Sequence, residues 1–182
     1  MSKILIILSL LTFISAEIHV YSGESIQDAI DTAPSGETII VHDGTYIENL
    51  LIEKDLILRS ENGAGSTIID GSQSRSLGST IVIRPQSGSS DKPMVEIDGF
   101  GITGGKGTDI INKTIEDHPI EKVGGGLFVY VNSPKINNCE IIGNGNNNID
   151  KGGGIFAVSD KEDSDFSTRD DYVDADDLTP AE

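Results

Sequence analysis

Three aspartates are the first side chains in this sequence whose type could do chemistry. Asp70, Asp98 and Asp109 could supply the two carboxyl groups that hydrolyse a glycosidic bond. That reaction needs a pair about 5 to 9.5 Å apart, a separation that spacing along the chain does not define. Aspartates in turns between strands more often hydrogen-bond the backbone, so we expect a structural role for all three.

Lysine or arginine could supply the base of a polysaccharide lyase, which removes the proton next to a uronate carboxylate. None of the basic residues lies in a recognisable catalytic pattern; those in the body of the chain are Lys54, Arg59, Arg75, Arg84, Lys92, Lys106, Lys113, Lys122, Lys135 and Lys151. The 13 Lys+Arg and 30 Asp+Glu give a net charge of −17, which repels a polyuronate unless a cleft or bound cations reverse the field. The same charge argues against nucleic acid and anionic membranes as partners.

Metal ligands are scarce in the sequence. The chain has three histidines, His19, His42 and His118. Together with the single Cys139 they show none of the spacings of a zinc site, and we expect the histidines to be isolated on surfaces or turns. The run from Asp160 to Asp165 (D-x-E-D-x-D) would suit calcium, but it lacks the turn glycine and the closing glutamate of an EF-hand loop. We therefore expect no cofactor, with calcium as the alternative.

Asparagines form the densest polar cluster: Asn137, Asn138, Asn144, Asn146, Asn147 and Asn148. Amide side chains hydrogen-bond sugar hydroxyls well, so the cluster is a candidate carbohydrate site. Asparagine also tolerates the left-handed turn conformation and forms ladders between strands, and we expect this structural role instead.

The elements that would position these side chains begin after a targeting segment. Residues 1–16 (MSKILIILSLLTFISA) combine Lys3, an apolar stretch and small residues, which is typical of a secretory signal peptide cleaved after Ala16. The apolar stretch of about eleven residues is too short to span a membrane as a helix. We therefore expect a secreted chain with no membrane span after cleavage.

A single domain over residues 17–158 and a tail over residues 159–182 are expected next. Ten acidic residues against two basic ones predict that the tail is disordered. Inside the domain, residues 105–123 (GKGTDIINKTIEDHPIEKV) interrupt the pattern of strands. Their polarity predicts a protruding loop, which is the first place to look for a ligand.

One helix is predicted, over residues 25–33. Ile26, Ala29, Ile30 and Ala33 fall on one apolar stripe, and Ser25 is a suitable N-cap. The helix is short, so it needs tertiary burial to persist.

Short runs rich in β-branched residues, bounded by Gly, Asn, Asp, Ser or Pro, predict strands along the rest of the domain. Two units repeat: residues 97–104 (IDGFGITG) match 136–143 (INNCEIIG), and 124–128 (GGGLF) match 152–156 (GGGIF), about 28 residues later. An antiparallel sandwich has no reason to repeat a turn-plus-strand unit, whereas the stacked coils of a parallel β-helix do. The repeat aligns Cys139 with Phe100, which predicts a buried cysteine.

The segment over residues 26–71 resembles the start of right-handed parallel β-helix proteins of the pectin-lyase-like superfamily. The resemblance covers residues 26–158. It implies an all-β, right-handed parallel β-helix solenoid whose N-terminal helix closes the open end of the coil. The string G-T-Y-I-E over residues 44–48 is similar to an element of pectin methylesterases, but the later glutamine and aspartate motifs of those enzymes are missing. We therefore expect Gly44 to make a turn and Tyr46 to pack at a corner.

The superfamily includes lyases, hydrolases, esterases and non-enzymes, so the resemblance implies a fold more than an activity. We expect a secreted or cell-surface protein that binds polysaccharide or a surface glycan, or mediates adhesion, without catalysis. A polysaccharide-active enzyme, either pectate-lyase-like or pectin-esterase-like, is the alternative. An inert fragment of a longer repeat protein is the third hypothesis. No residue is assigned as catalytic, cofactor-binding or metal-binding.

Overall fold

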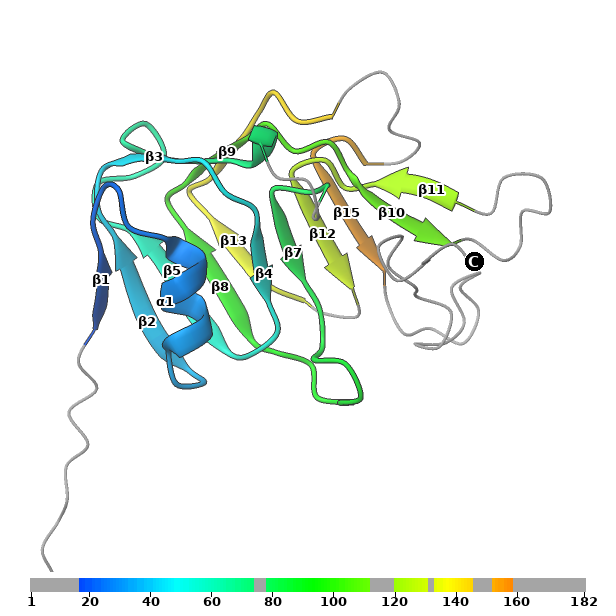
Figure 1. Cartoon of the computed structure of the whole chain (residues 1–182), viewed down its shortest axis with the longest axis horizontal. Coiled ribbons are helices and arrows are strands. Elements are labelled where there is room, and N and C mark those ends of the chain that lie inside the picture. Colours follow the sequence, from blue (N-terminus) through cyan, green and yellow to red (C-terminus); the bar gives the residue numbers. More distant parts are fainter. Residues whose placement is uncertain (1–16, 74–77, 112–119, 131–132, 146–151, 159–182) are drawn as a thin grey trace, which may run out of the picture.

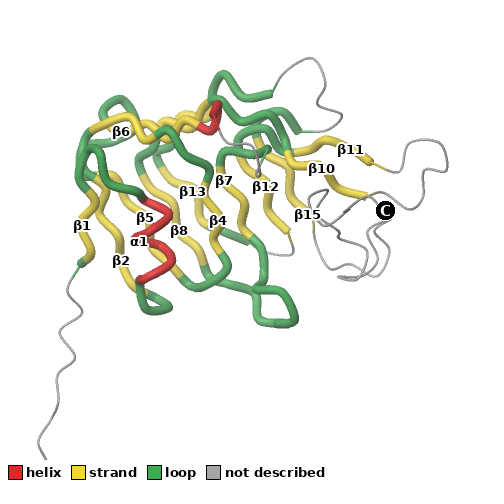
Figure 2. Tube along the Cα trace, viewed as in Figure 1, coloured by secondary structure: helices red, strands yellow, loops and turns green. Residues whose placement is uncertain are grey.

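The computed structural model describes residues 17–73, 78–111, 120–130, 133–145 and 152–158. This part of the chain consists mostly of short strands, with one α-helix, α1 (Ile26–Thr32), and one 3-10 turn, η1 (Gly71–Gln73) (Figures 1 and 2). The predicted signal peptide with its cleavage at Ala16 and the predicted acidic tail over residues 159–182 lie outside the described residues. Both stay predictions.

Most strands belong to three parallel sheets. Sheet A contains, in spatial order, β1 (Ile18–Val20), β2 (Glu37–Val41), β5 (Leu56–Ser60), β8 (Val95–Asp98) and β13 (Lys135–Asn137). Sheet B contains β3 (Gly44–Tyr46), β6 (Thr67–Asp70), β9 (Gly101–Thr103) and β14 (Glu140–Ile141). Sheet C contains β4 (Leu50–Ile52), β7 (Ile81–Ile83), β12 (Leu127–Tyr130) and β15 (Ile155–Val158).

The chain visits these sheets in a constant order. It passes from β2 to β3 to β4, then through β5-β6-β7, β8-β9-β12 and β13-β14-β15, each time in the order A, B, C. Every pairing within the three sheets is parallel. The fold is therefore all-β with parallel sheets, as predicted, and an antiparallel sandwich is ruled out.

The repeats found in the sequence are register partners in the structure. Ile97 lies opposite Ile136, and Ile102 lies opposite Ile141. In the second repeat, Leu127 lies opposite Ile155. The turn in the first repeat uses positive φ angles, 83° at Gly99 and 49° at Asn138. Glycine and asparagine suit this left-handed conformation, which explains why the repeat has Gly99 in one coil and Asn138 in the next.

Alternate residues of the strands fill one apolar core. Ile39 and Leu58 of sheet A, Ile69 of sheet B, and Leu50 and Ile81 of sheet C have no exposed surface and belong to one cluster. Each such side chain contributes about 1.5–3 kcal/mol when it leaves water. Packing between the three sheets therefore stabilises strands that are too short to persist alone.

The segment over residues 105–123 is not the simple loop predicted from its polarity. It contains an antiparallel hairpin of β10 (Thr108–Ile111) and β11 (Ile120–Val123). Ile110 and Val123 pack with Phe128 against the outer face of sheet C. On the other face, Asp109 and Lys122 form an ion pair. The apolar residues of this hairpin are buried only because they pack on sheet C. The polar composition of the segment gives no sign of that contact, so the sequence predicted a loop.

Helix α1 begins after the N-cap Ser25, within the predicted range. It follows β1 and lies beside β4, the edge strand of sheet C (Figure 1). The Gln27 side chain accepts from Leu51 N at 2.8 Å and donates to Leu51 O at 3.1 Å, as a neighbouring strand would. The helix thus covers an edge that would otherwise be open to pairing with another chain.

Two side chains hold the ends of α1. The Glu48 carboxylate accepts from Ile26 N at 2.8 Å and from Gln27 N at 3.2 Å. At the other end, Lys54 Nζ donates to Asp31 O at 3.0 Å and to Ala33 O at 2.8 Å. An acid at the amino end and a base at the carboxyl end both satisfy backbone groups and suit the helix dipole.

Candidate binding face on sheet A

Three consecutive strands of sheet A each carry a polar residue directly after a buried one. The buried residues are the register partners Val20, Val41 and Ser60. The residues that follow them are Tyr21, His42 and Glu61. Because side chains alternate between the faces of a sheet, these three reach the outer face together.

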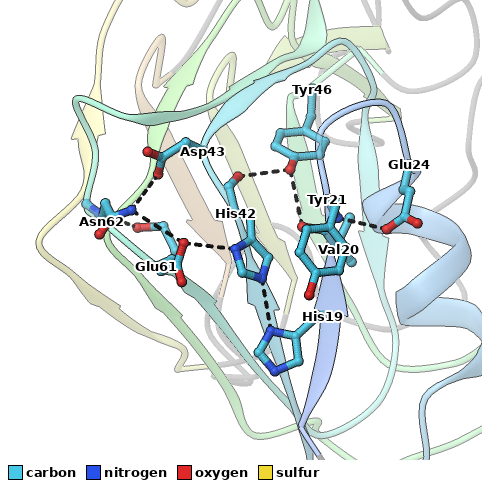
Figure 3. A network of polar contacts seen from close by, with 11 residues as sticks. His19, Val20, Tyr21, Glu24, His42, Asp43, Tyr46, Glu61 and Asn62 are labelled. Carbon is cyan, nitrogen blue, oxygen red and sulfur yellow. Dashed lines mark hydrogen bonds and ion pairs between the residues drawn. The ribbon is translucent and has the colours of Figure 1, made fainter.

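A chain of hydrogen bonds joins two histidines and a carboxylate on this face (Figure 3). His19 Nδ1 lies 3.0 Å from His42 Nε2. The other nitrogen of that ring, His42 Nδ1, lies 2.8 Å from Glu61 Oε2. His42 is mostly covered, with 19% of its side chain exposed, whereas 46% of the Glu61 side chain is exposed.

Tyr21 completes the cluster by stacking on His42. The two ring centroids are 4.2 Å apart and the planes differ by 13°. Its backbone N–H donates to Glu24 Oε2 at 2.8 Å, which fixes the segment between β1 and α1. Tyr21 nevertheless stays 54% exposed. We call His19, Tyr21, His42 and Glu61 the His–Tyr cluster.

Neighbouring polar groups hold the cluster in place (Figure 3). Asn62 Nδ2 donates to Asp43 Oδ1 at 2.9 Å and to Glu61 Oε2 at 3.4 Å. Tyr46, which is buried as predicted, donates its hydroxyl hydrogen to His42 O at 2.9 Å. These contacts position the Glu61 carboxylate and the backbone of His42.

The expectation that the histidines are isolated is wrong for His19 and His42. They are 23 residues apart in the chain, so spacing alone gives no sign of contact. The signal that could have found them is the alignment of H-V-Y over residues 19–21 with I-V-H over residues 40–42, since parallel register brings these triplets side by side. The third histidine, His118, lies outside the described residues.

The outer face of sheet A continues as a ladder of charges across β5, β8 and β13. Arg59 Nε lies 3.5 Å from Asp98 Oδ2, and Arg59 Nη2 lies 3.9 Å from Glu96 Oε1. Lys135 Nζ lies 4.0 Å from Glu96 Oε2. Asn138 Nδ2 donates to Asp98 Oδ1 at 2.8 Å. Ion pairs as exposed as these contribute about 0–1 kcal/mol each, so they shape a polar surface more than they stabilise the fold.

The three candidate aspartates are not brought together as a catalytic pair. Asp98 lies in sheet A within the ladder, and Asp109 lies in the hairpin beside Lys122. Asp70 lies in sheet B and accepts from Ser72 N at 2.9 Å. Each therefore takes part in a local contact on a different element.

Of the described candidate asparagines, Asn137 and Asn138 donate to the carboxylates of Glu96 and Asp98, whereas Asn144 holds backbone. Asn144 Nδ2 donates to Ile102 O at 2.7 Å, and its Oδ1 accepts from Gly105 N at 3.0 Å. This amide bridges neighbouring coils. The candidates Asn146, Asn147 and Asn148 lie outside the described residues.

Cys139 occupies the position of Phe100 in the next coil, as the repeat predicts, but it is only half-buried. The difference arises because Phe100 has further coils on both sides, while no described strand pairs with the far side of β14. Burial still raises the pKa of the Cys139 thiol, with a smaller contribution from Asp98. The thiol therefore has little thiolate character near neutral pH.

A second surface feature lies beside the carboxyl end of α1. Two adjoining depressions of about 460 and 440 Å³ share Glu53, Lys54 and Gln86 in their walls. Lys54 is engaged by the helix carbonyls, and Arg84 Nε contacts Glu53 Oε1 at 3.0 Å. Lys54 and Arg84 therefore already have local partners beside these depressions.

The His–Tyr cluster is suited to binding rather than to nucleophilic attack. A stacked aromatic pair can pack on the face of a sugar ring, and the surrounding imidazole, carboxylate and amide groups can hydrogen-bond hydroxyls. Within the described ranges, no group of three or more His, Cys, Asp or Glu side chains is arranged to hold a metal ion. None of the helices in these ranges is long and apolar enough to cross a membrane.

Comparison with known proteins gives one partial relative. The chain is 39% identical over 103 residues to a protein named "Cell surface glycoprotein" from Methanothermus fervidus. The match covers 50% of this chain and 15% of the relative, so the chain spans only a small part of that protein. No family model matches the chain, and no solved structure matches it. The comparisons therefore establish similarity to a segment of a cell-surface protein.

Proposed function

We propose that this chain is a right-handed parallel β-helix of the pectin-lyase-like class that acts at the cell surface. The repeated order of sheets A, B and C and the parallel register of successive coils support the fold. The relative named as a cell surface glycoprotein supports the location. A secretory signal over residues 1–16 would deliver the chain there.

The proposed activity is binding of carbohydrate, without catalysis, through the outer face of sheet A. The observation that carries this proposal is the Tyr21–His42 stack, held 4.2 Å between centroids beside polar side chains. Tyr21 is 54% exposed, so a sugar ring can reach it. The net charge of −17 favours a neutral polysaccharide over a polyuronate.

Affinity electrophoresis tests this proposal. The purified chain is run in gels that contain a neutral β-glucan, a mannan, pectate or alginate. We expect retardation by a neutral polysaccharide, and Tyr21→Ala should abolish it because the stacking surface is lost. Met94→Ala is the matched control, since Met94 is 77% exposed and lies beside the other depressions. Equal mobility of the unaltered chain in all gels would contradict the proposal.

The alternative is a polysaccharide-active enzyme, and a product assay separates it from binding. The chain is incubated with pectate, alginate and methylated pectin, with and without calcium. Unsaturated uronides would indicate a lyase, and methanol would indicate an esterase. Either product would replace the binding proposal, because binding alone leaves the polymer unchanged.

A further inference from the structure

The two histidines of the His–Tyr cluster have the arrangement of a pair of metal ligands. His19 Nδ1 and His42 Nε2 face each other at 3.0 Å. The contact is an N–H···N hydrogen bond in which one nitrogen donates and the other accepts, and it lies beside the parallel pairing of His19 with Ile40 and of Val20 with Val41. The contact does not depend on the carbohydrate proposal.

Glu61 prepares one of the two nitrogens to bind a metal. An ionised carboxylate only accepts hydrogen bonds, so at 2.8 Å His42 Nδ1 must donate its hydrogen to Glu61 Oε2. In the neutral ring this leaves the lone pair on Nε2, the atom that faces His19. A carboxylate behind a histidine in this way orients the ring and increases its basicity toward a metal.

We propose that His19 and His42 bind a divalent transition metal that prefers imidazole, with Cu²⁺ the strongest candidate. Two nitrogens 3.0 Å apart, each about 2.0–2.1 Å from a shared ion, subtend an angle of about 95° at that ion. Such an angle suits neighbouring positions of a square-planar or tetragonal site, the geometry of Cu²⁺ and Ni²⁺. Cu²⁺ also binds nitrogen sites most tightly among the divalent first-row metals.

The remaining positions of the metal belong to water or to an added ligand. The described residues provide no third His, Cys, Asp or Glu in a metal-binding arrangement. Without the metal, His19 Nδ1 donates its hydrogen to His42 Nε2; when the metal binds, His19 takes the tautomer with its hydrogen on Nε2, so both facing nitrogens present lone pairs. His19 is exposed, which gives the ion a path to the pair.

Titration with Cu²⁺ tests the proposal. We expect one bound ion and an electron paramagnetic resonance spectrum with hyperfine coupling to two imidazole nitrogens. His19→Gln and His42→Gln should each weaken binding by about tenfold or more, and Glu61→Gln by about 10- to 100-fold. His118→Gln is the matched control, because it removes the remaining histidine of the chain and should change nothing.

Three outcomes would overturn the proposal. One is a bound ion whose spectrum shows no imidazole nitrogen. Another is that His19→Gln abolishes Cu²⁺ binding while His42→Gln and Glu61→Gln leave the affinity unchanged. That result would indicate binding by the N-terminus alone, because cleavage after Ala16 makes His19 the third residue and a free amine with a histidine in third place binds Cu²⁺ by itself. The third is no binding by the unaltered chain. Thermal melts confirm folding, and the exposed position of His19 makes His19→Gln the variant least able to disturb it.

Discussion

At the scale of single residues, Tyr46 connects the start of the chain to the next coil. Its single hydroxyl hydrogen points between two acceptors, His42 O at 2.9 Å and Val20 O at 3.3 Å, while its ring packs in the core. Burial raises the pKa of the Tyr46 hydroxyl, and the nearby carboxylates of Glu24, Glu48 and Asp43 raise it further. The phenol is therefore held in its neutral form, as the donor the fold requires.

This raised pKa predicts a loss of stability at alkaline pH. The unfolded chain releases the tyrosine proton near a pKa of about 10, and the folded chain releases it only at higher pH. The stabilisation is complete below the unfolded pKa and is lost as the pH rises through the folded one. Urea unfolding of the unaltered chain and Tyr46→Phe, compared at pH 8 and pH 11, measures this. Their difference in stability should shrink or reverse at pH 11.

Tyr21→Phe is the control for this experiment, because Tyr21 is 54% exposed and its hydroxyl has no such burial. The free energy of unfolding of Tyr21→Phe should match that of the unaltered chain at both pH values. A difference between the unaltered chain and Tyr46→Phe that is the same at pH 8 and pH 11 would contradict the prediction.

Cys139 gives a second prediction at this scale. Burial raises the pKa of its thiol, and the backbone N–H groups of Phe100 and Gly99 lower it only in part. Because the thiolate is the reactive form, Ellman's reagent at pH 8 should label the folded chain about tenfold or more slowly than the chain in urea. Equal labelling rates in the two conditions would show that the thiol is freely ionised and accessible.

At the scale of elements, α1 depends on Glu48 more than on its own sequence. A helix of 7 residues is marginal in isolation. Glu48 accepts from two backbone N–H groups of its first turn and from the Ser25 hydroxyl, at 2.8 to 3.2 Å. Hydrogen bonds to a charged group contribute about 1.5–3 kcal/mol each when they are well buried.

Glu48→Ala should therefore lower the free energy of unfolding by about 2–3 kcal/mol, since it leaves three donors unpaired at once. Asp28→Ala is the matched control. Asp28 also carries a negative charge in the first turn but is exposed, so it should cost less than about 1 kcal/mol. Urea unfolding measures both losses. Equal losses would mean that Glu48 acts only through the helix dipole.

An element could be predicted from the sequence when the residues it packs against repeat its own pattern, and not when it packs against a part of the chain with a different pattern. The helix and the strands around Ile97 and Ile136 carry their own pattern, because each coil repeats the residues of its neighbour. The hairpin over residues 108–123 could not be predicted, because its apolar side is matched to the far face of sheet C. The His19–His42 contact was missed for a similar reason, since the two residues are 23 apart in the chain and meet only because β1 pairs with β2.

At the scale of the whole molecule, the two ends of the stack of coils differ. At the start, α1 covers the edge of β4, and the first interior residues are fully buried. At the other end no described strand pairs with the far side of β13, β14 or β15. Ile142 is 64% exposed and Ile155 is 46% exposed. Burial, and with it the free energy that resists local opening, therefore decreases along the chain.

Amide hydrogen exchange should follow this gradient. The Leu50 and Leu56 amides donate to Thr80 O and Met94 O in the covered part of the stack, while the Glu140 and Ile142 amides donate to Phe100 O and Ile102 O at its end. We expect the second pair to exchange about 100-fold faster or more, because β14 can separate from β9 without opening the other coils.

Two substitutions at equivalent positions of the repeat test whether burial, and with it stability, decreases toward the last described coil. The measured quantity is the free energy of unfolding. Ile97→Ala removes a side chain with no exposed surface and should cost about 2–5 kcal/mol. Ile136→Ala removes its register partner, which is only partly buried, and should cost less than about 1.5 kcal/mol. Equal losses, together with equal protection of the two pairs of amides, would show that the last coil is covered in solution as fully as the first. A smaller loss for Ile136→Ala, together with faster exchange of the Glu140 and Ile142 amides, would mean that the coil of β13, β14 and β15 is the first part of the domain to unfold.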